Sequence, residues 1–228
     1  MLDDAFEALK KYDWGTDRAP LAPITDAVAA AHGNPELQKD LETRLLAALG
    51  SDISRDAKDY VCRMLTIVGT VAAAPVLAGL LGSANHSHMA RFALERIPAP
   101  EAAKALREAI RLQPEFAGAH ATLATVLRQL GDTEGAAAES RAGAEIAKQK
   151  TNEQAALFAT NSGRRLLNAG DIDGAISQFR AAIQSVPGYA PAHYELGLAL
   201  QRKGDKSGAA GEFKKASELD PRLKAPAI

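Results

Sequence analysis

The chain has 228 residues, 46% of them hydrophobic and 24% charged, so it is long enough to bury a substantial core. Its formal net charge of −1 leaves no basic excess, which argues against nucleic acid as a partner bound through bulk charge. A single cysteine, Cys62, excludes an internal disulfide framework and a zinc site built on cysteines.

The sequence contains no recognisable targeting signal or membrane-spanning segment. It contains no run of about 18 uncharged apolar residues of the kind that spans a bilayer. Its first residues, Met-Leu-Asp-Asp, lack the basic and apolar regions of a signal peptide. We therefore expect no direct insertion into a membrane. A cytoplasmic location is expected for the chain as written, or a periplasmic one if a leader has been removed.

Stretches with a helical spacing of apolar residues are expected throughout the N-terminal part. Most of the breaks between them carry glycine, proline, serine or asparagine, which are typical of turns and helix caps. The stretches lie at about residues 2–12, 21–31, 35–49, 55–68, 71–81 and 86–97. No segment alternates apolar and polar residues over the length of a strand, so the predicted fold class is all-α.

One block of this part has a recognisable pattern. Residues 73–97, AAPVLAGLLGSANHSHMARFALERI, resemble a HEAT-like repeat, in which an Ala-Pro-x-Leu helix leads through a turn into an arginine-bearing helix. The resemblance extends over roughly residues 54–112. It implies that a first region, residues 1–98, is built from stacked antiparallel helix pairs.

The C-terminal half contains an internal repeat with a period of 34 residues. Residues 156–189 align without a gap on residues 190–223, and the matched positions are Gly170-Asp171 with Gly204-Asp205, Ala175 with Ala209, Phe179 with Phe213, Ala182 with Ala216, and Pro187 with Pro221. A weaker copy covers residues 117–150, and a half-repeat covers residues 101–114. Five extra residues, 151–155, separate the weaker copy from the next one.

Each matched position has a physical role. Gly197 lies on an apolar helix face, where the missing side chain allows another helix to approach closely. Gly204 supplies the left-handed residue that ends this helix, and Asp205 is placed to cap the next one. Phe213 then packs from the second helix of the pair. Each repeat is therefore predicted to be a pair of antiparallel helices.

The spacing resembles the tetratricopeptide repeat, whose signature is a small residue in mid-helix, a Gly-Asp turn, an alanine, an aromatic residue, a second alanine and a closing proline. The resemblance implies a second region, residues 99–228, of such repeats. The whole chain is then expected to be a right-handed superhelical solenoid of antiparallel helix pairs, HEAT-like first and tetratricopeptide-like afterwards, with about thirteen helices.

No catalytic constellation is found in the sequence. Cys62 lies among apolar helix residues, where a thiol is typically buried and unreactive. His86 and His88 are two residues apart, unlike the i, i+4 pair that binds zinc on a helix, so a metal-dependent activity there is the less favoured alternative. His120 and His193 occupy equivalent positions and are predicted to be packing residues. We expect no enzymatic activity, no metal and no cofactor.

The remaining candidate site is a groove. In a stack that resembles the tetratricopeptide repeat, the first helix of each pair lines the concave surface and faces a ligand. By register, the candidate groove residues are Arg128, Asn161, Arg164, Asn168, Tyr194, Leu198 and Arg202. The three arginines are predicted to form a cationic ladder for the carboxylates of an extended peptide. The likeness to the carboxylate clamp of chaperone-binding repeats is partial, because the clamp lysines are replaced by small residues such as Ala121 and Thr125.

The two ends of the array are expected to differ. The outer face of the last helix carries Ala210, Lys214 and Ser217, which predicts an end that faces water. Phe6 and Trp14 near the N-terminus form no such polar pattern and are a candidate end interface.

Together these features predict a non-catalytic scaffold that binds a protein or peptide segment in its concave groove, for example as an accessory subunit of a larger assembly. The alternative is a structural module that associates with itself. The partner is expected to be a protein rather than a nucleic acid, and its identity is not encoded in any motif.

Overall fold

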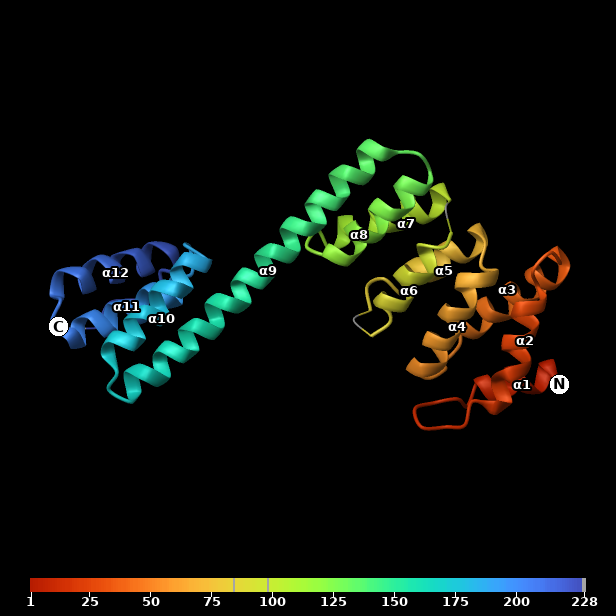
Figure 1. The fold of residues 1–228 in the computed structure, drawn as a ribbon, viewed down its shortest axis with the longest axis horizontal. Helices are drawn as coiled ribbons and strands as arrows, with labels where there is room; N and C mark the ends of the chain where they lie inside the picture. The colour runs from red at the N-terminus through yellow and green to blue at the C-terminus, as the bar shows by residue number, and fades with distance from the viewer. Residues whose placement is uncertain (84, 98, 227–228) are drawn as a thin grey trace. The chain divides into compact units, whose positions relative to one another are not determined.

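The computed structural model describes residues 1–83, 85–97 and 99–226 (Figure 1). Within these ranges the chain forms twelve α helices and two short 3-10 helices, and no strand. The predicted all-α class is confirmed, and the predicted number of about thirteen helices is close.

The chain divides into two compact units, Met1–Ile146 and Ala147–Ile228. Helix α9, Thr133–Asn168, contributes residues to both units. The predicted region boundary falls at Pro98, which lies outside the described residues.

Unit 1 begins with helices close to the predicted stretches. Its elements are α1 (Leu2–Leu9), η1 (Ala19–Leu21), α2 (Ala22–Ala30), α3 (Pro35–Leu49), α4 (Arg55–Val68), η2 (Val71–Ala73), α5 (Ala74–Gly79), α6 (Ser87–Leu94), α7 (Pro100–Leu112), α8 (Ala117–Gln129) and the first part of α9. Helices α3 and α4 have the predicted bounds. Their ends are well marked because the side chains of Asn34 and Ser54 accept hydrogen bonds from the N–H groups of Leu37 and Ala57.

The first stretch is shorter than expected. It was predicted over residues 2–12, but the helix ends at Leu9. The N–H groups of Lys11 and Tyr12 donate to carbonyl groups three residues back, at 3.0 and 3.2 Å, and not four residues back as in an α helix. The chain therefore ends the helix in a tight turn.

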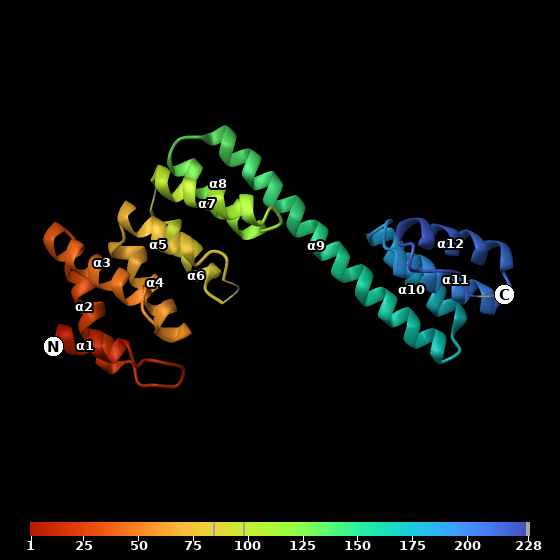
Figure 2. The same ribbon diagram turned by 180° about the vertical axis from the view of Figure 1, so that it is seen from behind.

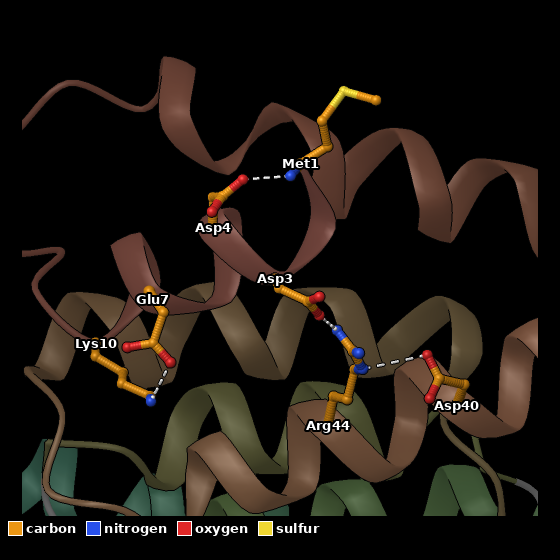
Figure 3. A network of polar contacts seen from close by, with 7 residues as sticks. All are labelled: Met1, Asp3, Asp4, Glu7, Lys10, Asp40 and Arg44. Atoms are coloured by element: carbon orange, nitrogen blue, oxygen red, sulfur yellow. Dashed lines mark hydrogen bonds and ion pairs between the residues drawn. The ribbon is translucent and has the colours of Figure 1, made fainter.

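Polar contacts join the first helix of unit 1 to α3. The guanidinium group of Arg44 on α3 donates to Asp3 at 2.7 Å and lies 3.3 Å from Asp40 (Figure 3). It also lies 5.3 Å from the ring centroid of Phe6. Leu9 is fully buried in the core of unit 1 and also holds α1 in place.

Unit 2 shows the predicted repeat plainly. Besides the end of α9 it contains α10 (Ile172–Ser185), α11 (Ala190–Lys203) and α12 (Lys206–Leu219), which pack side by side in sequence order (Figures 1 and 2). Gly170 and Gly204 have φ angles of +87° and +90°, a conformation that glycine adopts without strain. Asp171 and Asp205 each accept a hydrogen bond at 2.9 Å from the N–H three residues on.

A glycine and a phenylalanine pack together in each repeat of unit 2. A Cβ atom on Gly163 would lie 2.5 Å from the ring of Phe179, and one on Gly197 would lie 2.7 Å from the ring of Phe213. Both rings are buried. The close approach predicted for Gly197 is therefore used to seat an aromatic ring directly against a helix backbone.

The extra residues between the weaker repeat and the next one are helical. Residues 151–155 lie inside α9, which runs through 36 residues without a break. No glycine or proline occurs between residues 144 and 162 of this helix, so nothing in the local sequence interrupts the hydrogen-bond ladder.

No helix in the described ranges combines the length and the apolar character needed to cross a bilayer. The HEAT-like character of the N-terminal region stays a prediction.

Candidate functional site

Three of the predicted groove residues form a stripe on the last part of α9. Asn161, Arg164 and Asn168 lie at i, i+3 and i+7 and are exposed. Seven residues of helix rise by about 10 Å, so the two asparagine side chains are separated by roughly that distance along one helix face. Within the described chain, neither asparagine side chain is assigned a hydrogen bond.

Three more predicted residues form a stripe on α11. Tyr194, Leu198 and Arg202 lie at i, i+4 and i+8. Tyr194 and Leu198 are half-buried, and the ring of Tyr194 lies 5.5 Å from that of Phe213 in a tilted arrangement. Both side chains therefore present apolar surface from positions fixed by the core beneath them.

One arginine of each stripe makes a direct contact with the other helix. Arg164 Nε donates to Glu195 Oε1 at 2.7 Å, between side chains that are 47% and 13% exposed. Arg202 Nη1 donates to the carbonyl oxygen of Leu167 at 3.1 Å, close to the end of α9. These six residues with Glu195 are called the α9–α11 surface below. The sequence did not reveal that Arg164 has a carboxylate partner within the chain.

The other predicted residues lie in unit 1. Arg128 is exposed in the last turn of α8. Trp14 is 86% exposed, whereas Phe6 is half-buried against the core of unit 1 and beneath Arg44. Phe6 is therefore engaged within its own unit, and Trp14 is the more accessible of the two candidate end residues.

His120 and His193, which occupy equivalent positions, have equivalent hydrogen-bond partners that were not predicted from the sequence. His193 Nδ1 lies 2.6 Å from Glu212 and its Nε2 lies 3.0 Å from the carbonyl oxygen of Pro187. His120 repeats this arrangement with Glu139 at 2.6 Å and the carbonyl oxygen of Pro114 at 3.1 Å. The signal was available, because each histidine follows a proline by six residues and precedes a glutamate by nineteen.

These histidines are structural in their contacts. Both are buried, and both ring nitrogens of each are already bonded within the chain. His86 Nδ1 lies 2.9 Å from Ser83 Oγ at the start of α6. Among the described residues no group of three or more potential metal ligands occurs.

The single thiol is also enclosed. Cys62 is 1% exposed on α4, and burial raises the pKa of its thiol to about 12. Because the thiolate is the reactive form, we expect a disulfide reagent such as dithionitrobenzoate to modify the folded protein at neutral pH roughly a hundredfold or more slowly than the protein in denaturant. Equal rates in the two states, measured by absorbance of the released thiolate, would contradict the burial of Cys62.

A family model described as the tetratricopeptide repeat matches residues 99–150 and 160–223, which together make up just over half of the chain. A search of curated proteins found no match.

Solved structures similar to this chain share little sequence identity with it. YrrB, described as a tetratricopeptide repeat protein with an unusual peptide-binding site, is 20% identical over 88% of this chain and 94% of its own, with a TM-score of 0.30. MamA from AMB-1 is 17% identical over 88% and 98%, with a TM-score of 0.29. BtubC from P. vanneervenii is 14% identical over 100% and 94%, with a TM-score of 0.29. At these values the three structures do not indicate what this chain binds.

Proposed function

Because the chain belongs to the tetratricopeptide repeat family, we propose that it is a non-catalytic scaffold whose α9–α11 surface binds an extended segment of a protein partner. Such a scaffold works by holding a partner segment on a rigid helical face, so its affinity depends on side chains that are already in place.

The observation that carries the proposal is the pair of free amides on α9. The side chains of Asn161 and Asn168 are exposed, and neither is assigned a bond within the described chain. A side-chain amide offers a donor and an acceptor, as does each peptide unit of an extended segment. Their separation of about 10 Å along the helix corresponds to roughly three residues of extended chain.

The arginines supply fixed charge beside these amides. Glu195 orients the guanidinium group of Arg164, and the carbonyl of Leu167 orients that of Arg202. Each guanidinium carries five N–H donors, so most of them stay available for an acidic side chain or terminal carboxylate of the bound segment. Tyr194 and Leu198 supply the apolar contact. The cationic ladder that adds Arg128 of unit 1 stays a prediction.

The test uses a displayed library of random 12-residue peptides selected against the whole protein, followed by affinity measurements with the selected peptides. We expect the double variant Asn161→Ala and Asn168→Ala to weaken binding about tenfold to a hundredfold, since two amide anchors are lost. Gln184→Ala on α10 removes an exposed amide outside the α9–α11 surface and is the matched control. It should leave the affinity unchanged.

Two results would contradict the proposal. One is a selected peptide whose affinity falls equally in the Gln184→Ala control. The other is a failure to select any peptide together with a mass in solution that rises with concentration, which would favour the self-associating module. Sedimentation of the unmodified protein over a hundredfold range of concentration provides that measurement.

A further inference from the structure

A second surface of unit 2, along α12, has the properties of a helix-binding site. A hollow of about 380 Å³ lies along α12, where it is lined mainly by Ala209, Ala210 and Phe213, with Lys206 and Lys214 beside them. Gln201 of α11 and Ala225, from the segment that follows α12, line it as well. The lining residues of α12 run from Lys206 to Ser217, a length of about 16 Å.

The internal repeat shows what shape fits this hollow. A shift of 34 residues places α10 on α12, so the face of α12 that lines the hollow corresponds to the face of α10 on which α11 packs. That packing buries Ala192 and Ala199 of α11 completely. On α12, the isoleucines 176 and 183 of α10 are replaced by the smaller Ala210 and Ser217. This face, which the sequence predicts to be an end that faces water, therefore has the orientation of an interface with a helix and lacks the side chains that would fill the hollow.

The charges around the hollow on α12 differ from those where α11 packs on α10. At the start of α10, Asp173 accepts a hydrogen bond from Lys203 of α11 at 2.6 Å. The corresponding residue of α12 is Ser207, and its neighbour Lys206 is positive. No ion pair or hydrogen bond within the described chain is assigned to the side chain of Lys206 or Lys214. A helix in this position would meet positive charge where α11 meets a carboxylate.

We propose that the hollow on α12 is a docking site for an amphipathic helix of a partner protein, with small apolar residues on its inner face and acidic residues at its C-terminal end. The helix lies on α12 as α11 lies on α10, antiparallel to it. Acidic residues in its last turn then pair with Lys206. The partially negative C-terminal end of the helix also faces this lysine, which adds to the attraction. No residue of the α9–α11 surface lines the hollow, so this proposal does not depend on the function proposed for that surface.

The test compares two synthetic helices that differ only in charge. The first probe is residues 190–203 of this chain with Arg202→Glu and Lys203→Glu, and the second has the unchanged sequence. Both carry a covalent staple between solvent-facing positions, because a free helix of this length is marginally stable. We expect the acidic probe to bind the whole protein about tenfold more tightly in a fluorescence anisotropy titration, because two charges that repel Lys206 are replaced by two that attract it across partly screening solvent.

Variants of the protein locate the site. Lys206→Glu with Lys214→Glu should abolish the preference for the acidic probe. Lys215→Glu replaces one lysine by glutamate at an exposed residue of α12 that does not line the hollow, so it should keep the preference, whereas Lys206→Glu alone should reduce it. Amide chemical shifts of Ala209, Ala210 and Phe213 should move during the titration, whereas those of Asn161 and Asn168 should not.

Several outcomes would overturn the proposal. Equal binding of the two probes, or the same loss in the Lys215→Glu protein, would show that no acidic helix is recognised at the hollow. Shifts confined to α9 would place the probe on the α9–α11 surface. A concentration-dependent dimer that the Lys206→Glu and Lys214→Glu changes dissociate would make a second copy of this chain the occupant instead.

Discussion

Replacing Phe179 by alanine is expected to lower the free energy of unfolding of unit 2 by about 3–5 kcal/mol. The ring is fully buried and lies directly against the backbone at Gly163. Its removal takes a large apolar surface out of the core and leaves a cavity that the rigid helices around it cannot fill. Native-state amide hydrogen exchange of α10, α11 and α12, followed by mass spectrometry, measures the change in this unit directly.

The control for this prediction is another phenylalanine of the same unit. Phe158 on α9 is 70% exposed, so Phe158→Ala should change the stability of unit 2 by no more than about 0.5 kcal/mol. Peptides from α3 and α4 of unit 1 should exchange at unchanged rates in both variants. A loss in the Phe158→Ala protein as large as that in the Phe179→Ala protein would contradict the packing described for unit 2.

The second large effect is expected from adding one methyl group. Gly163→Ala should destabilise unit 2 by about 1–3 kcal/mol, because the new Cβ atom would lie 2.5 Å from the ring of Phe179. Helix propensity acts in the opposite direction, since alanine in a helix interior is normally better than glycine by about 1 kcal/mol. The predicted sign therefore depends on the contact with the ring and not on the helix itself. Hydrogen exchange of α10 and α11 provides the measurement.

A glycine whose added methyl group would touch no other side chain tests helix propensity apart from the contact with a ring. Gly211 lies on α12, and apart from the adjoining backbone of its own helix no atom lies within 4 Å of a Cβ placed there. Gly211→Ala should accordingly stabilise α12 by up to about 1 kcal/mol. Combining Gly163→Ala with Phe179→Leu should cost less than the sum of the two single changes, because the smaller side chain makes room for the methyl group. Strict additivity would show that the glycine and the ring do not restrain each other.

Features set by neighbouring residues were predictable. The bounds of α3 and α4 follow from caps and from the spacing of apolar residues within one helix. The repeat of unit 2 was recognisable because Gly204, Asp205 and Phe213 recur with their partners at a fixed distance along the chain. The end of α1 at Leu9 was missed because residues 10–12 could either continue the helix or form a tight turn, and no capping residue in the sequence indicates which.

The candidate site was predictable only in part. The helical register placed Asn161, Arg164 and Asn168 on one face of α9, since register depends on spacing alone. The pairing of Arg164 with Glu195 was not foreseen, because it joins residues on different helices whose side-chain directions depend on how those helices pack. The hydrogen bonds of His120 and His193 also join different elements, but here the sequence held a usable signal, because a proline and a glutamate recur at the same distances from both histidines.

The sequence by itself determined that this protein is all helical, that its C-terminal half repeats every 34 residues, and where the turns of those repeats lie. These properties depend on local backbone preferences and on a periodic pattern that is complete within each repeat. Only the tertiary structure decided that residues 151–155 continue a helix, that Arg164 has a carboxylate partner, and that a hollow flanked by lysines lies on α12. Each of these depends on which surfaces meet in space and which are left uncovered, and a pattern along one chain does not specify that.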